Sequence, residues 1–365
     1  MGGDFDLIIL GASARAAAAS AVHAGMRPWC CDLFADLDLQ AMAVVHRCPR
    51  QAYPHGMLAI LEAAALPARI PVLLTGAMEN DPQLIATLEA QRPLLTSSAL
   101  AVRAVRDPEA LPRLVPGSGL RFCPAQVGPG VVTPQDAHRY LIKPQRGRGP
   151  IRFATAGEPV AADAFVQRYV SGRTLSAVYV GGPSGARLFG ATQQLVGEPV
   201  FATRSFRYCG SIGPIDVGGQ LGEVWRHLGH ELHRAFGLRG VFGVDAVLDH
   251  NGDLWPVEVN PRYTAGVEVL ERAVGRSVLA PDRGAASVLG AARGPQFGKA
   301  IVYASETMRA PDVRAMFGSD RVADVPVPGE IIEAGWPVCT LLAQGPARDV
   351  CMDRLAAMGR RLAKL

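Results

Sequence analysis

One stretch of the chain, residues 240–266, constrains the fold more than any other: GVFGVDAVLDHNGDLWPVEVNPRYTAG. Its segments 241–248 and 254–259 are apolar and rich in β-formers, and Asp249-His250-Asn251-Gly252 lies between them. Asn and Gly tolerate the positive φ that tight hairpin turns need. We therefore expect two antiparallel strands that are too apolar to lie free on the surface.

Polar side chains interrupt both of these strands. Asp245 lies in the first, whereas Glu258 and Asn260 are two residues apart in the second and so point to one face. A hairpin can bring Asp245 alongside them, and such oxygen ligands suit Mg²⁺ between phosphates. Arg262 follows at once as a fixed cation with fork geometry for phosphate or carboxylate oxygens. A surface hairpin with solvated acids is the other interpretation, but buried carboxylates need a partner or a metal.

Composition excludes several classes of protein. A net charge of +4 without a block of like charge gives no sign of a nucleic-acid partner. Seven cysteines, an odd number without a CxxC pair, indicate reduced thiols and a cytoplasmic location. The N-terminus lacks a leader-like pattern, and no apolar run reaches about 18 residues, so we expect no membrane partner.

The N-terminal third alternates between apolar strands and helices. Strands are expected at 7–10, 27–31, 43–46 and 70–74, with helices between them, which predicts an open parallel sheet and an α/β fold. The first turn, Gly11-Ala12-Ser13-Ala14-Arg15, lacks the full GxGxxG pattern. A scaffold turn is therefore the better interpretation than a dinucleotide site.

Two further features are candidates for chemistry. Lys143 ends a predicted strand, and the glycine-rich segment 145–149 follows it. A lysine there can meet phosphates while flexible glycines let backbone N–H groups reach the rest, although a basic surface loop is the alternative. A predicted helix at 218–238 carries His227, His230 and His233, for which a polar helix face is a better interpretation than a zinc site.

Taken in order, these features resemble the ATP-grasp superfamily. The resemblance rests on Lys143, on the strand and turn at 164–172, and on the hairpin with its Glu-x-Asn-Pro-Arg ending at Arg262. It implies an ATP-grasp fold with a Rossmann-like pre-ATP-grasp domain at 1–113, a lid subdomain at 114–182 and a metal-binding subdomain at 183–292. A small C-terminal β-rich domain would occupy 293–365.

The resemblance also implies a site that binds ATP and Mg²⁺, with Mn²⁺ as a substitute. Asp245, Glu258 and Asn260 would hold the metal, and Lys143 and Arg262 would act in catalysis. The residues implied in nucleotide binding are Lys143, Arg146, Gly147, Gly149, Gln167, Tyr169, Val170 and Thr174. Main-chain groups around Tyr169 and Val170 would read the base edge, and Ser13 and Arg15 in the first loop would touch a substrate.

The sequence departs from the family pattern at two places. The segment 102–110 offers Arg103 and Arg106 where many members carry a lysine, so either Arg106 replaces it or that contact is missing. Arg173 and Thr174 stand where an acid often holds the ribose hydroxyls. These departures put the early cation and tight ribose binding in doubt.

The activity implied is an ATP-dependent ligase that joins a small-molecule carboxylate to an amine through an acyl phosphate. Overall resemblance is greatest to ATP-grasp proteins of tetrahydromethanopterin and methanofuran one-carbon metabolism, which points to glutamate as one carboxylate. The alternatives are an ATP-binding regulator without turnover and an ATP-grasp carboxylase or kinase. The sequence does not identify the substrates, and a homodimer is one assembly to test.

Overall fold

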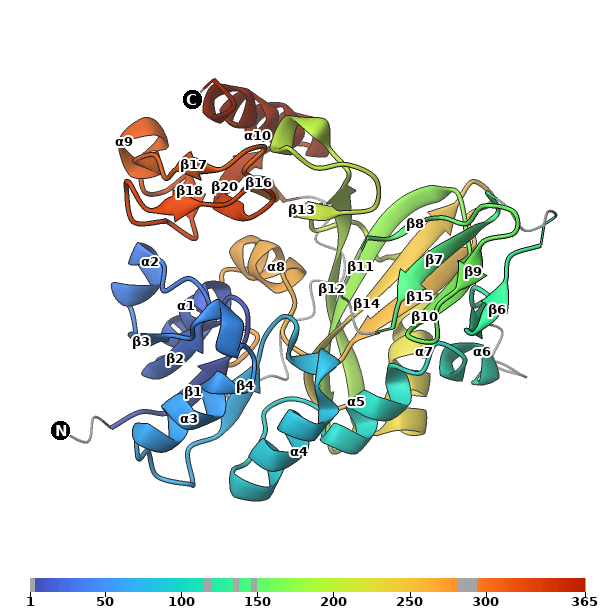
Figure 1. The fold of residues 1–365 in the computed structure, drawn as a ribbon, viewed down its shortest axis with the longest axis horizontal. Helices are drawn as coiled ribbons and strands as arrows, with labels where there is room; N and C mark the ends of the chain where they lie inside the picture. The colour runs from blue at the N-terminus through green and yellow to red at the C-terminus, as the bar shows by residue number, and fades with distance from the viewer. Residues whose placement is uncertain are drawn as a thin grey trace.

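A computed structural model describes residues 4–114, 120–133, 135, 138–145, 150–280 and 294–364. The chain begins with a parallel α/β unit, continues through a small sheet and a large antiparallel sheet, and ends on strands added to the large sheet (Figure 1). The predicted α/β class is confirmed.

The N-terminal unit is the predicted open sheet, in the order β3-β2-β1-β4 with all pairs parallel. Its first two strands and β4 are entirely buried, as expected of a sheet covered on both faces. Asp81 caps α4 by accepting from the Leu84 amide at 3.0 Å. The elements are β1 (Leu7–Leu10), α1 (Arg15–His23), β2 (Pro28–Asp32), α2 (Leu37–Gln40), β3 (Val44–Arg47), α3 (Gly56–Ala63), β4 (Val72–Leu74) and α4 (Pro82–Gln91), with 3-10 turns η1 (Arg50–Ala52) and η2 (Met78–Asn80).

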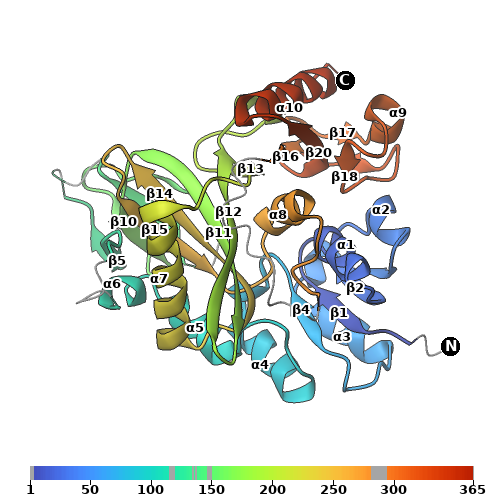
Figure 2. The ribbon, with the colours of Figure 1, turned by 180° about the vertical axis from the view of Figure 1, so that it is seen from behind.

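A small sheet, in the order β5-β10-β7-β8, follows the helices α5 (Ala99–Val105) and α6 (Ala110–Arg113). It lies over β14 and β15 of the large sheet, on the face opposite α7 (Figures 1 and 2). Its strands are β5 (Ala125–Val127), β7 (Tyr140–Pro144), β8 (Arg152–Phe153) and β10 (Ala164–Arg168), and the short pair β6 (Gly130–Val131) and β9 (Pro159–Val160) lies beside it.

The large sheet is antiparallel throughout, in the order β15-β14-β11-β12-β13-β16-β20-β18. The segment 206–214 contains two glycines, yet it includes the regular strand β13 in the middle of this sheet. The strands are β11 (Gly172–Gly182), β12 (Gly185–Val196), β13 (Tyr208–Gly213), β14 (Gly240–Asp249), β15 (Leu254–Asn260), β16 (Gln296–Tyr303), β18 (Val322–Ala323) and β20 (Pro337–Gly345).

One face of the large sheet packs against α7 (Gly219–Phe236), whose apolar stripe includes Trp225 and Leu228 (Figure 2). Tyr179 and Phe242 stack from neighbouring strands beneath it, with ring centroids 5.1 Å apart. Gly229 is required there because a Cβ would lie 2.4 Å from the Tyr179 ring. Polar side chains at alternate positions of these strands must therefore point to the other face.

The other face meets the small sheet and α8 (Gly266–Val274), and α8 also packs against α1 of the N-terminal unit. The C-terminal strands extend the large sheet, because β13 pairs with β16 across the predicted boundary at 292/293. The helix α10 (Arg348–Leu362) packs on β16 and β20. The remaining elements are η3 (Pro199–Phe201), β17 (Met308–Arg309), α9 (Val313–Phe317) and β19 (Ile331–Ile332). Among the described helices, none has the length and apolar character needed to span a bilayer.

Candidate active site

The predicted hairpin brings its two acids together. Asp245 on β14 and Glu258 on β15 are directly opposed Cα partners, and the register shifts immediately after Asp245. The Asn260 amide Nδ2 donates to Asp245 Oδ2 at 3.1 Å. The Asp249 carboxylate fixes the turn by accepting from the amides of Asn251 and Asp253, both at 2.9 Å. The hairpin thus holds two carboxylates and an amide on one face of the sheet.

The two carboxyl groups have different electrostatic surroundings. Burial, together with the charge of Glu258, raises the pKa of Asp245 to about 6. Burial acts in the same direction on Glu258, but three cations outweigh it and hold the pKa of Glu258 below its usual value. These cations are Lys143, Arg106 and Arg262. Glu258 therefore stays ionised at neutral pH within a convergent positive field.

Arg106 and Arg262 approach the pair from two different elements. Arg106 follows α5, and its Nη1 donates to Glu258 Oε1 at 2.9 Å while Nη2 donates to Asn80 Oδ1 at 2.9 Å. Arg262 Nη2 donates to the Asn260 side-chain oxygen at 3.2 Å. Its Nε lies 2.8 Å from the Glu79 carboxylate. Arg106 therefore places a cation beside Glu258 although segment 102–110 has no lysine.

Lys143 connects the small sheet to the hairpin through Gln167. Lys143 Nζ donates to Gln167 Oε1 at 3.2 Å, and Gln167 Nε2 donates to the Val257 carbonyl of β15 at 3.2 Å. The two side chains come from paired strands, β7 and β10, and are 8% and 6% exposed. The Lys143 ammonium also lies 5.7 Å from the centre of the Phe165 ring. The cation is thus buried between the two sheets.

Of the other residues predicted to bind the nucleotide, Tyr169 and Val170 lie between β10 and β11, and Thr174 lies on β11. The Tyr169 ring is 38% exposed and contacts Phe153 and Phe206, with centroids 4.9 Å and 6.1 Å away. Its amide already donates to the Arg139 carbonyl at 2.8 Å, so this N–H group is not available to a base edge. Thr174 Oγ1 donates to the Gln194 carbonyl at 3.3 Å. The predicted loop residues Arg146, Gly147 and Gly149 lie outside the described residues, and Val170 follows Tyr169 in the turn before β11.

A row of polar side chains crosses the large sheet away from the acidic pair. Asp245 is the direct partner of Ser176, which is in turn the partner of Thr192. Two residues along β12, Gln194 is opposed to Ser211, and Ser211 is opposed to Lys299. Side chains of directly paired residues share a face, so this row forms a polar floor from β15 to β16. The side chains of Ser176 and Gln194 also counteract the rise in the pKa of Asp245.

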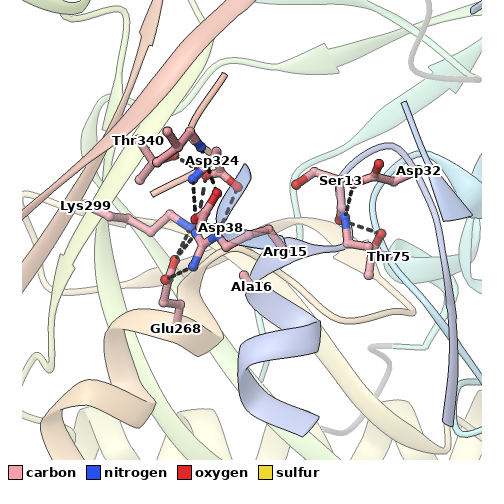
Figure 3. Close-up of polar contacts among 12 residues, drawn as sticks. Ser13, Arg15, Ala16, Asp32, Asp38, Thr75, Glu268, Lys299, Asp324 and Thr340 are labelled. Carbon is pink, nitrogen blue, oxygen red and sulfur yellow. Dashed lines mark hydrogen bonds and ion pairs between the residues drawn. The ribbon is translucent and has the colours of Figure 1, made fainter. Parts of the chain in front are cut away.

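At its far end the floor reaches a buried ionic cluster (Figure 3). Lys299 Nζ donates to Glu268 Oε2 at 2.7 Å, and Arg15 binds Glu268 with both of its terminal nitrogens. Arg15 also donates to the two oxygens of Asp324 at 3.0 and 3.2 Å. All three nitrogens of the Arg15 guanidinium donate to carboxylates and the residue is 3% exposed, which argues against the expected contact with a substrate. Ser13 is exposed, and its contact with a substrate stays a prediction.

Sequence reasoning missed several of these residues. Glu79 and Asn80 belong to no recognisable sequence motif. Their partners, Arg262 and Arg106, are distant from them in the sequence. The polar floor had a partial signal, since Thr174 and Ser176 alternate with the apolar residues Leu175 and Ala177 in a strand. The three histidines of α7 form no metal centre, because no group of three or more His, Cys, Asp or Glu among the described residues is arranged to hold one.

Comparisons with known proteins agree with this architecture. Residues 123–266 match the family model described as the ATP-grasp domain, whereas the search of curated proteins gave no match. The N5-carboxyaminoimidazole ribonucleotide synthetase of Thermus thermophilus is similar in fold, with a TM-score of 0.66, 15% identity and coverage of 97% of this chain and 98% of that chain. The L-amino acid ligase of Bacillus licheniformis has a TM-score of 0.67 at 12% identity, covering 97% of each chain.

A carboxylase has a comparable fold. The biotin carboxylase domain of the Hydrogenobacter thermophilus 2-oxoglutarate carboxylase, solved with MgADP, ADP and bicarbonate, has a TM-score of 0.66 at 12% identity. The match covers 96% of this chain and 89% of that chain. Ligase and carboxylase folds therefore match about equally well. The chain has the ATP-grasp fold, and its residues 123–266, which include the acidic hairpin, match the ATP-grasp domain family.

Proposed function

We propose that the protein is an ATP- and Mg²⁺-dependent ligase that joins a carboxylate to an amine through an acyl phosphate. The observation that carries the proposal is the directly opposed pair Asp245 and Glu258, on which three cations converge. A phosphoryl-transfer site needs little covalent help from the protein, but it must position its reactants and neutralise charge. The site described above has the residues for both tasks.

The residues of the hairpin fit a divalent cation. Burial and the neighbouring charge of Glu258 raise the pKa of Asp245, and a cation between the two carboxylates would relieve their repulsion. Asp245, Glu258 and the Asn260 oxygen would hold Mg²⁺, or Mn²⁺ in its place. The bound ion would neutralise charge on the β- and γ-phosphates. Phosphate oxygens would complete its shell, since among the described residues no third acid joins the pair.

The chain's own cations would hold the rest of the nucleotide. Lys143 would contact phosphate oxygens, and Gln167 and the turn at Tyr169 and Val170 would face the base. Thr174 lies two residues before Ser176 on the polar face and would meet the ribose. Arg106 and Arg262 would stabilise the charge that develops on the transferring phosphoryl group. The predicted nucleotide contacts of Arg146, Gly147 and Gly149 stay a prediction, because these residues lie outside the described part of the chain.

The proposed reaction has two steps. A substrate carboxylate oxygen attacks the γ-phosphorus, the bond to the bridging oxygen breaks, and ADP leaves. An amine nitrogen then attacks the acyl carbon, loses a proton, and displaces inorganic phosphate to form the amide. The overall resemblance to proteins of one-carbon cofactor metabolism makes glutamate the first carboxylate to test.

The test is ADP release by the full chain with ATP, Mg²⁺ and mixed pools of amino acids and amines, followed by mass spectrometry. We expect pool-dependent ADP release and a new mass equal to two pool members minus water. Glu258→Gln should abolish both, and Glu223→Gln, an exposed change on α7, should abolish neither. ADP without a condensation product would favour a carboxylase or kinase. ATP binding with no stimulated turnover would favour a regulator.

A further inference from the structure

A second cavity lies away from the proposed nucleotide site, between the N-terminal unit and the C-terminal strands. It encloses about 110 Å³ and shares no lining residue with the Asp245 and Glu258 pair. The N-terminal unit contributes Ser13, Phe34 and Asp36, and Asp324 lines it from the C-terminal side. Because Ser13 is exposed, the cavity reaches solvent beside the first loop.

Asp36 is the unusual residue of this cavity. It is 7% exposed, and its Oδ2 has no hydrogen-bond partner among the described residues. It occupies the position before α2, yet its side chain makes no capping bond to that helix. A buried carboxylate without a partner is unfavourable unless something supplies hydrogen bonds or positive charge.

The surrounding residues do not supply that partner. Asp324 and Asp38 both lie beside the nearest cation, Arg15, and Asp324 also accepts from the Thr340 hydroxyl at 2.5 Å (Figure 3). The carboxylate of Asp32 accepts from three backbone amides, those of Phe34 and Ala35 in its own segment and that of Ala14 before α1. Burial, together with the charges of Asp324, Asp32 and Asp38, raises the pKa of Asp36 to about 9, so without a cation beside it the acid is protonated at neutral pH, and a bound cation would lower this pKa and displace the proton.

The two arginines of the cavity wall also have their own acids. Arg47 lies 2.5 Å from Glu330 and donates to the Leu33 carbonyl at 3.1 Å. Arg50 lies 3.0 Å from Glu333, and its guanidinium stacks 3.6 Å from the centre of the Trp336 ring. The ionisable group of the cavity that lacks a partner among the described residues is therefore the acid Asp36. The aromatic side chain of Phe34 lines the same cavity.

We propose that this cavity binds the ammonium group of a small organic amine, with the Asp36 carboxylate as its acceptor. An ammonium group carries three N–H donors and a positive charge, which match an unpartnered acid, and aromatic faces attract it further. A metal ion fits less well, since Asp324 and Asp38 already lie beside Arg15 and the Asp32 carboxylate already accepts from backbone amides, which leaves Asp36 without a second free acid beside it among the described residues. The inference does not depend on the proposed ligase activity, because binding of the amine needs no ATP.

The test uses the full chain without ATP and measures binding of methylammonium by calorimetry and by the shift in melting temperature. We expect saturable binding to the wild type, with K⁺ and Mg²⁺ failing to compete. Tetramethylammonium, which has no N–H group, should also fail to compete. Asp36→Asn should weaken binding about tenfold to a hundredfold because a charge-assisted hydrogen bond is lost. Asp353→Asn, an exposed change on α10, is the matched control and should leave the affinity unchanged.

Two results would overturn the inference. One is the absence of saturable methylammonium binding by the wild type, which requires no variant and so does not depend on how Asp36→Asn folds. The other is equal binding by the wild type and a folded Asp36→Asn protein. Adding ATP, Mg²⁺ and the carboxylate pool then distinguishes the source of the amine. Its incorporation into a product identifies a substrate, and binding without incorporation identifies an effector, and both results support the site.

Discussion

Asp245 and Glu258 lie directly opposite each other on neighbouring strands, yet their pKa values shift in opposite directions. Burial opposes ionisation of both acids and Arg262 favours it in both, but Glu258 also has Lys143 and Arg106 nearby, so positive charge prevails there. Glu258 is thus ionised at neutral pH, whereas the pKa of Asp245, at about 6, lies close to neutral pH. This asymmetry results from the small sheet and α5 meeting the hairpin on the Glu258 side.

Arg106 is expected to replace the missing lysine in function. Arg106→Ala removes a charge-assisted bond to Glu258 and should lower Mg²⁺- and ATP-dependent ADP release about 10²–10³-fold. Arg106→Lys keeps the charge and should lose less. Arg103→Ala is the matched control, since Arg103 is exposed and lies on α5, the helix that Arg106 follows. Equal rates for Arg106→Ala and Arg103→Ala would show that Arg106 has no catalytic role.

Lys143 is expected to act mainly in nucleotide binding. Lys143→Met removes the buried ammonium between the two sheets and should raise the Kd of ATP about tenfold to a hundredfold. Lys364→Met, an exposed change near the C-terminus, should leave the Kd unchanged. Calorimetric titration with ATP, without a second substrate, measures this directly. An unaltered Kd in a folded Lys143→Met protein would exclude the phosphate contact.

Arg15 is expected to act in stability. Its guanidinium joins Glu268 on α8 to Asp324 near the C-terminal strands, so Arg15→Met leaves buried carboxylates without their main partner (Figure 3). Breaking a buried pair in this way costs about 3–5 kcal/mol in the free energy of unfolding. Urea titration should show this loss, whereas Arg27→Met in an exposed ion pair should show almost none. Similar stability of the two variants would mean that the cluster is solvated in solution.

Glu271 should make stability depend on pH. Its side chain is 8% exposed on α8, and burial raises its pKa to about 7 from an ordinary value of 4.5. The folded state then binds more protons than the unfolded chain between these values, so this residue lowers the free energy of unfolding as the pH rises from about 4.5 to about 7. Glu271→Gln removes that loss and should be more stable than the wild type at pH 8, by on the order of 1–3 kcal/mol.

The advantage of Glu271→Gln should shrink as the pH approaches about 5, because the wild-type carboxyl group is then protonated. Gln can still accept from the Ser20 hydroxyl and the Val278 amide, which the carboxylate does now. Urea titrations at the two pH values measure the effect, and Glu62→Gln on the exposed face of α3 is the control. A difference between variant and wild type that does not change with pH would contradict the assignment.

The parts of the site that depend on local pattern could be predicted from the sequence. The turn at Asn251-Gly252 and the period of two in the strands set Asp245 opposite Glu258, and the structure confirms that pairing. The α/β class and the parallel N-terminal sheet followed from the alternation of strands and helices. The division into four domains, the metal ligands and the nucleotide contacts stay predictions.

Contacts between distant segments could not be predicted in this way. Arg15 and Glu268 are separated by 253 residues, and no local pattern encodes which acid will meet a buried arginine. The same holds for Glu79 beside Arg262, and for β13 joining β16 within one sheet. The glycines of segment 206–214 give it weak strand propensity, but pairing on both edges makes β13 a regular strand.

The central claim is that the site activates a carboxylate as an acyl phosphate. In the most direct measurement, the amino acids of the pool carry ¹⁸O in their carboxylate groups and are incubated with the protein, amines, ATP and Mg²⁺. The inorganic phosphate is then analysed by mass spectrometry. We predict one ¹⁸O atom in the phosphate for each ADP formed, because the bond between carboxylate oxygen and phosphorus survives when the amine attacks carbon. Unlabelled phosphate accompanying ADP release would contradict the account.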